Sequence, residues 1–374
     1  MERQRSVQMR PVHEVSWPPP RRSGSRRLLV IALALLLVVL AVGYSAWWFH
    51  AATRFRDGTL DWIESRRADG WHLAYAGMSR VGFPLRLGLR FDKPVVSAPA
   101  GDWTWSGSRA LLSTKVFAPR PLRLAVEGDQ ALELGDAPAA GGERHRYSGN
   151  ADEFIVDLLP GGWVPNGHLR LRDLAVAGNR AGDGFGVARL DLVSRGDPVA
   201  AAGPEVSGYA MELTVDGFRL PHSEAVPLCG EVAHLAVDAK LFGALEAGPW
   251  PAALAEWREA GGVIEATRLL LVCGPLTLDG EGTFALDSAG QPIGAMTTRI
   301  HGYEAALDRL AADRVIPAQT VATTKIVLRA LARSGGEGAP TLVAPVSVQD
   351  RTLSIGPAAL LRLPPLHWLD GAGH

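Results

Sequence analysis

Cysteine is scarce in this chain. Among 374 residues only Cys229 and Cys273 occur, each followed by a glycine. Two cysteines without a nearby pair of cysteines or histidines cannot fill the tetrahedral shell of a structural zinc. The sequence therefore predicts no metal site. An oxidising compartment would permit a disulfide between them; two buried free thiols are the alternative, and we favour the disulfide.

Recognised catalytic motifs are absent as well. The chain has no G-x-S-x-G, no H-E-x-x-H and no C-x-x-C, and it has no P-loop because no lysine follows a glycine. The histidines from His72 to His367 form no i, i+4 pair. We therefore expect a protein without enzymatic activity or cofactor. An unrecognised hydrolase is the alternative, and it would require a cleft with a strongly perturbed titratable group.

The chain also lacks an excess of positive charge. It carries 38 basic and 39 acidic residues, and lysine occurs only at Lys93, Lys115, Lys240 and Lys325. Seven arginines and two glutamates precede residue 28, so 31 basic and 37 acidic residues remain beyond it. We therefore expect no nucleic-acid partner for this mildly acidic part, since proteins that bind nucleic acid carry basic patches.

One long hydrophobic run dominates what is present. Residues 28–49, from Leu28 through Leu40 to Trp47, Trp48 and Phe49, contain no charge. As a helix they measure about 33 Å, which exceeds a hydrocarbon core of about 30 Å. Arginines cluster before the run, and short Arg-rich flanks stay cytoplasmic. The sequence thus predicts a single-pass anchor in a bacterial inner membrane, with a periplasmic C-terminal domain.

A cleaved secretory signal is the alternative to an anchor. Its apolar region is typically about 7–15 residues long and ends at small residues of the A-x-A kind. Neither Tyr44-Ser45-Ala46 nor His50-Ala51-Ala52 has small residues at both required places. We therefore expect residues 1–27 to form a cytoplasmic tail and residues 28–49 to remain as a transmembrane helix. Residues 50–70 continue a helical pattern to Gly70 and predict a stalk.

Beyond the stalk, short strands with apolar residues on one face prevail. Strict alternation indicates half-buried strands. It occurs at 85–91, 122–126, 169–171, 211–216, 235–238, 276–279, 283–287, 346–349 and 353–355. Glycine, proline and aspartate separate these segments, as in antiparallel meanders. The predicted fold class is mainly β (α+β), with one large antiparallel exported region.

Helices and a domain boundary interrupt this pattern. Helical segments are predicted at 151–159, 251–260, 303–312 and 318–333, the last two as a pair broken at Pro317. The loop 197–204 is the best candidate boundary. It would separate an N-terminal β unit (71–198) from a C-terminal β unit with the helix pair (199–374).

A stripe of large apolar side chains is the candidate binding site. Pro84 favours an extended Phe83, which would put Phe83 on one face with Leu85, Leu87 and Leu89. Trp103 and Trp105 likewise share one face. Such a stripe is more often packed core. The alternative is an apolar groove for acyl chains formed by these residues: Phe83, Leu85, Leu87, Leu89, Trp103 and Trp105.

Several local patterns resemble a known family. They are Val81-Gly82-Phe83-Pro84-Leu85-Arg86-Leu87, Trp103-Thr104-Trp105, Leu278-Asp279-Gly280-Glu281-Gly282-Thr283, Arg299-Ile300-His301-Gly302-Tyr303 and the closing Leu363-Pro364-Pro365-Leu366. As a set they are similar to domain of unknown function 2125, a family of single-span envelope proteins of Gram-negative bacteria. The resemblance covers most of the exported region and implies location and a β-rich domain, with no activity. The late part is also loosely similar to AsmA-type envelope proteins, whose long sheets are thought to carry lipids.

Two functions follow from this reading. The first is an anchored periplasmic protein whose β-rich domain binds an apolar or lipid-like envelope component or supports envelope biogenesis. The second is a scaffold that holds a packed β domain beside a membrane protein complex. They differ in whether the apolar strand faces close on another sheet or open onto a trough.

Overall fold

A computed structural model gives the structure of the chain. It describes residues 24–135, 145–159, 166–179, 182, 184–196, 207–219, 229–243, 250–314, 316, 318–331 and 341–363. The chain divides into two units, Met1–Ala51 and Ala52–His374. The candidate boundary at 197–204 lies outside the described residues and stays a prediction.

Helix α1 (Gly24–Ala68) contains both the predicted span and the predicted stalk. In the first unit most of its apolar side chains are exposed, including Leu28 and Leu40, whereas Trp48 is buried. The rings of Tyr44 and Trp47 lie 5.8 Å apart, and those of Trp48 and Phe49 meet edge to face at 5.2 Å. Among the described residues, α1 is the one helix long and apolar enough to cross a membrane.

The second unit begins with the stalk part of α1 and continues as a single sheet. Gly70, at φ 89°, ends the helix as predicted, with its N–H bonded to the Arg67 carbonyl. The first strands are β1 (His72–Ala74), β2 (Gly77–Val81), β3 (Arg86–Asp92), β4 (Val95–Ser97), β5 (Trp103–Lys115), β6 (Ala118–Leu134), β7 (His145–Asn150), β8 (Glu153–Leu159) and β9 (Asn166–Gly178). These strands pair antiparallel, with β7 and β8 successively bridging β6 and β9.

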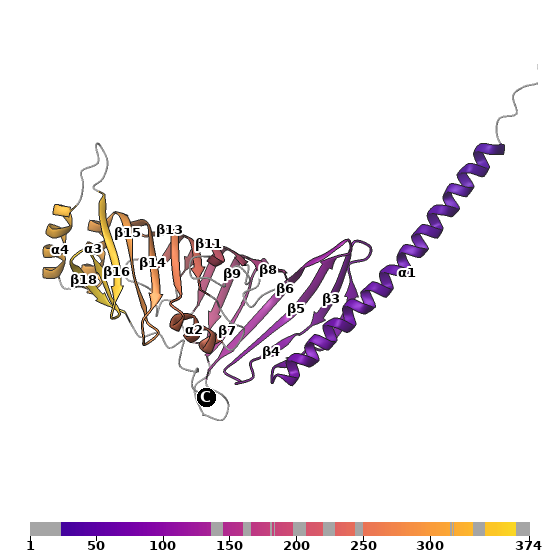
Figure 1. The fold of residues 1–374 in the computed structure, drawn as a ribbon, viewed down its shortest axis with the longest axis horizontal. Helices are drawn as coiled ribbons and strands as arrows, with labels where there is room; N and C mark the ends of the chain where they lie inside the picture. Colours follow the sequence, from indigo (N-terminus) through magenta and orange to yellow (C-terminus); the bar gives the residue numbers. More distant parts are fainter. Residues whose placement is uncertain are drawn as a thin grey trace, which may run out of the picture. The chain divides into compact units, whose positions relative to one another are not determined.

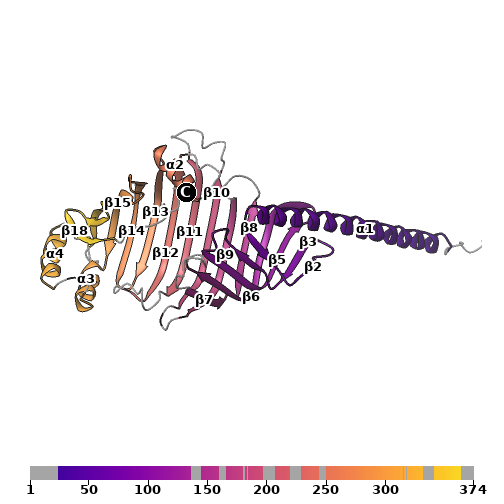
Figure 2. The ribbon, with the colours of Figure 1, turned by 90° about the horizontal axis from the view of Figure 1, so that it is seen from below.

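The remaining strands form a simple antiparallel meander. They are β10 (Phe185–Gly196), β11 (Ser207–Arg219), β12 (Glu231–Phe242), β13 (Val263–Cys273), β14 (Leu276–Leu286), β15 (Pro292–His301), β16 (Leu342–Gln349), β17 (Thr352–Ile355) and β18 (Ala358–Arg362). All 18 described strands belong to one sheet. Figures 1 and 2 show them following one another in a single layer. The predicted mainly β fold is confirmed.

Three further helices accompany the sheet. They are α2 (Trp250–Glu259), α3 (Tyr303–Ala312) and α4 (Ala318–Leu331), and all three confirm predicted helices. Helix α3 follows Gly302, whose φ of 70° allows the turn out of β15. A bidentate contact of Arg329 with Glu304 joins α4 to α3. This helix pair lies at the C-terminal end of the sheet (Figure 1).

Two predicted elements are wrong. The expected helix at 151–159 is strand β8, because Phe154 and Val156 pair with Leu171 and Leu169 of β9. Ile155 lies on the other face, so apolar and polar residues do not alternate strictly in this segment of the sequence. The two strands expected at 276–279 and 283–287 are one strand, β14.

Among the residues that the structure describes, hydrophobic cores lie at opposite ends of the sheet. In the first, Ile63 of the stalk is buried with Leu89, Phe91 and Ala110. In the second, α3 and α4 cover β15 and β16; its buried members include Ile300, Tyr303, Leu307, Leu328 and Leu342. Helices therefore cover the two ends of one sheet face, and the strands between them carry the candidate site.

Candidate functional site

A continuous row of apolar side chains crosses the sheet. Residues that pair directly in antiparallel strands project on the same face. We call this set the central row: Leu89, Leu112, Leu124, Val156, Leu169, Leu192, Leu213, Val237 and Leu269, each paired with the next. Gly280, Thr298 and Ala344 extend it across β14, β15 and β16. At a strand spacing of about 4.8 Å, the eleven steps from β3 to β16 measure roughly 50 Å.

A second row runs beside the central row on the same face. Its members are Phe154, Leu171, Leu190, Val215, Leu235, Leu271, Leu278, Ile300 and Leu342, again paired in sequence. The two rows are two residues apart on most strands, which is the spacing of side chains on one face. Together they make a broad apolar band across most of the sheet.

The side chains at both ends of this band are buried, whereas those in its middle are half-buried, except for the buried Val215 of the second row. Leu89 is 1% exposed under the stalk, and Leu342 is 0% exposed under the helix pair. Between them, the central row from Val156 to Val237 is half-buried and belongs to neither core. We call this half-buried middle, together with the second-row residues from Phe154 to Leu235, the trough. Within the described ranges no second sheet faces it.

A hollow of about 510 Å³ deepens the trough at its N-terminal side. The second-row residues Phe154 and Leu171 line it. Its other walls include Trp105, Leu132, Tyr147, Leu174, Val176 and Phe185. Trp105 donates its indole N–H to Gln130 at 3.3 Å, so the polar atom of that ring has a partner. This volume lies within the range of about 300–1,000 Å³ that small-molecule sites occupy.

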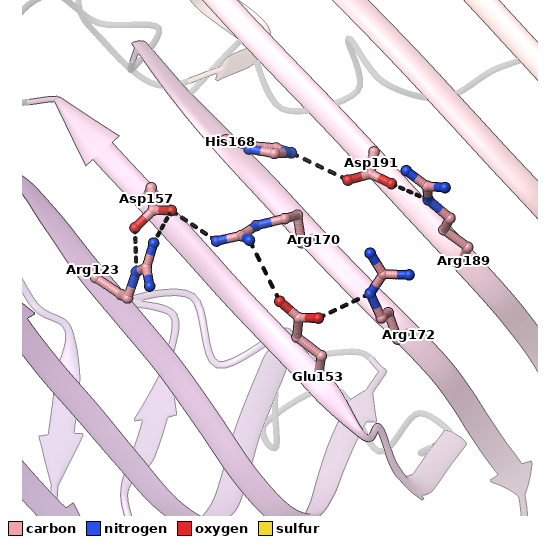
Figure 3. A network of polar contacts seen from close by, with 8 residues as sticks. All are labelled: Arg123, Glu153, Asp157, His168, Arg170, Arg172, Arg189 and Asp191. Carbon is pink, nitrogen blue, oxygen red and sulfur yellow. Dashed lines mark hydrogen bonds and ion pairs between the residues drawn. The ribbon is translucent and has the colours of Figure 1, made fainter.

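The opposite face of the same strands is charged. Figure 3 shows ion pairs that cross β6, β8 and β9 on that face. Asp157 accepts two bonds from Arg123, at 2.6 and 2.8 Å, and one from Arg170 at 3.0 Å. Glu153 accepts a bond from Arg172 at 2.9 Å. The hydrogen bonds from Arg123 hold the pKa of Asp157 below its usual range, against the effect of burial.

A second cluster continues this polar face on β9 and β10. His168 lies 3.2 Å from Asp191, which also accepts a bond from Arg189 (Figure 3). Burial opposes the ionisation of Asp191, yet its bonds with Arg189 and His168 outweigh that effect and lower its pKa. The charged groups of β6 to β10 thus pair with one another on one face. The trough on the other face offers apolar contact to a ligand.

The predicted groove residues do not come together. Trp105 lines the hollow, whereas the Trp103 ring packs against Trp71 at 5.7 Å. Leu87 and Leu89 are buried in the sheet. The strand begins at Arg86, so Phe83 and Leu85 lie in the β2–β3 turn and are exposed. The sequence pattern does not identify Phe154 and Phe185 as lining residues, because it predicts a helix at 151–159 and no strand at residue 185.

The two cysteines form a disulfide in this structure. Cys229 and Cys273 have Cα atoms 5.5 Å apart, and both are buried. The bond ties the residues before β12 to the end of β13, next to the pair Val232 and Cys273. No group of three potential metal-binding side chains occurs among the described residues.

One comparison with known proteins gives a match. A family model described as "Uncharacterized protein conserved in bacteria (DUF2125)" matches residues 48–364. No curated protein matches the chain. No solved structure matches it either.

Proposed function

The chain belongs to this family of uncharacterised bacterial proteins, and we propose that it is a membrane-anchored envelope protein whose trough binds the acyl chains of lipid-like molecules. The observation that carries the proposal is the central row, which is apolar from Leu89 of β3 to Leu269 of β13 but is half-buried from Val156 to Val237. Contiguous apolar surface that remains accessible on an otherwise polar protein marks a binding site.

The size of the trough suits an acyl chain. One leaflet of a hydrocarbon core is about 15 Å thick, half of about 30 Å, and the five central-row residues from β8 to β12 span about 19 Å at about 4.8 Å per strand. Burial of apolar surface contributes about 0.8 kcal/mol per methylene. Complete burial of a chain of roughly sixteen carbons from water would thus contribute at most on the order of 12 kcal/mol. That gain is comparable with the association cost of about 4–15 kcal/mol.

The anchor belongs to the same proposal. Helix α1 holds the protein in the bacterial inner membrane by a single pass, with its N-terminus in the cytoplasm and the sheet in the periplasm. The arginines before Leu28 support this orientation. A protein placed in this way meets lipids at the membrane surface, and the proposal assigns it no catalytic step.

Site-specific crosslinking tests the trough. Neighbouring residues on a strand face opposite sides, so Leu213 and Thr214 of β11 form a matched pair. A photoreactive amino acid is placed at either position in the full chain, in membranes supplied with phospholipid that has a labelled acyl chain. The proposal expects lipid adducts at position 213 and several-fold fewer at position 214.

Two results would count against lipid binding. Equal labelling at both positions would mean that lipid contacts are incidental. A protein adduct of fixed mass at position 213, in place of lipid, would favour the scaffold function, in which the trough is a surface for another protein.

A further inference from the structure

Two neighbouring turns at one end of strands β3 and β5 form an exposed apolar tip. The β2–β3 turn carries Phe83 and Leu85, which are 53% and 67% exposed, and the β5–β6 turn carries Phe117, which is 77% exposed. Arg86 of β3 pairs with Lys115 of β5, and the Val116 N–H donates to the Leu85 carbonyl at 3.2 Å. The two turns are therefore held side by side, and we call residues 83–85 and 116–118 the tip.

Positive charge surrounds the tip. Arg80, Lys115 and Arg120 are exposed beside it. No aspartate or glutamate occurs in residues 78–91 or 112–126, although the chain as a whole has more acidic than basic residues. Exposed aromatic and aliphatic side chains with basic neighbours are typical of surfaces that lie in the headgroup region of anionic membranes.

The tip lies at the same end of strands β3 and β5 as Ala52, where the chain enters this unit. At the other end, Arg67 donates to the Leu73 carbonyl at 2.6 Å, and Trp71 packs on Trp103 at the start of β5. From there the stalk runs back beside β3 and β5 (Figure 1). It covers about 22 Å from Arg67 to Ala52 at about 1.5 Å per residue, while β5 covers about 40 Å to Lys115 at about 3.3 Å per residue.

Chain connectivity relates this end to the membrane. Ala52 follows Phe49, the last aromatic residue of the predicted interfacial belt, by three residues. Three residues span at most about 10 Å. The chain therefore enters this unit within about 10 Å of the predicted belt, at the end that carries the tip.

From these observations we infer that the tip is a second membrane contact, in which Phe83, Leu85 and Phe117 insert into the headgroup region of the bilayer that holds α1. Lys115 and Arg120 then lie at the level of the lipid phosphates. The contact fixes the sheet at two points, the stalk and the tip. This inference rests on the proposed anchoring but not on lipid binding in the trough.

Depth-dependent fluorescence quenching tests the inference. Phe117→Cys is labelled with an environment-sensitive dye in the full chain, which is then reconstituted into vesicles of phosphatidylethanolamine and phosphatidylglycerol. Cys229 and Cys273 are bonded to each other and do not take the label. Ala100→Cys, in the exposed β4–β5 turn at the other end of the sheet, is the matched control. Nitroxide lipids should quench the dye at position 117 several-fold more than at position 100.

Each alternative outcome has a distinct meaning. Equal quenching at both positions, with the protein retained in the vesicles after alkaline extraction, would overturn the tip contact and leave the anchor intact. Release of the protein by alkaline extraction would overturn the anchor and with it the inference. A dye at position 117 that soluble iodide quenches as fully as at position 100 would also overturn it.

Discussion

Replacement of Asp157 by asparagine should destabilise the sheet measurably. The carboxylate joins three strands, because Arg123 of β6 binds both of its oxygens and Arg170 of β9 binds one. Its side chain is only 17% exposed. Asparagine retains one acceptor oxygen but loses the charge, so two guanidinium groups lose their main partner.

The expected cost follows from these contacts. Hydrogen bonds to charged groups contribute about 1.5–3 kcal/mol when shielded. Arg123 is about a third exposed, and solvent compensates part of that loss. We expect Asp157→Asn to lower the free energy of unfolding by about 1–2 kcal/mol. The control Asp279→Asn breaks a single exposed contact with Arg299 and should cost less than about 0.5 kcal/mol.

Urea denaturation of the full chain in detergent, followed by tryptophan fluorescence, measures both variants. The folded pKa of Asp157 is lowered, so its stabilising effect is present above the unfolded value of about 3.9 and is lost as pH falls through the folded value. The difference between wild type and Asp157→Asn should therefore shrink progressively below about pH 4. An equal cost for the two variants, or a difference unchanged at low pH, would refute the reasoning.

Three further substitutions test other contacts by the same unfolding measurement. The double variant Cys229→Ser, Cys273→Ser opens a link of sequence separation 44 and should lower the free energy of unfolding by up to about 4 kcal/mol. A variant that unfolds like the wild type without reductant would contradict this. Ile63→Ala removes a buried stalk side chain and should cost about 2–5 kcal/mol, whereas a neutral result would mean that the stalk does not pack on the sheet. Gly302→Ala should be strongly destabilising, since φ is 70° and a Cβ would lie 1.9 Å from the Pro275 carbonyl oxygen; native-like unfolding would mean that this backbone shifts freely.

Local patterns were sufficient to predict the four helices and eight of the eighteen described strands. The helix at 303–312 and the alternation at 211–216 are each determined by residues close in sequence, and the structure contains both, in α3 and β11. The uncharged run from Leu28 likewise predicts α1 without reference to any other part of the chain. Strand β8 was missed because Ile155 makes its charged face look partly apolar.

The trough could not be predicted in the same way. It depends on which residues stand opposite one another, for example Leu192 opposite Leu169 and Leu213, and alternation within one strand does not determine that register. The sequence instead predicts a groove near Phe83 and Leu85, where aromatic residues cluster in sequence. In the structure those two residues lie in a turn, and the trough is assembled from apolar residues of the consecutive strands β8 to β12.

The meander from β10 to β16 allows the width of this sheet to change. Among the described strands, each one from β10 to β16 pairs only with the strand before it and the strand after it. Insertion or deletion of one hairpin would leave all other pairs in place and change the width by about 10 Å, two strand spacings. As in solenoid repeats, contacts are confined to neighbours. The number of hairpins therefore sets the width of the sheet, and it can change during evolution without a change in the helices at either end.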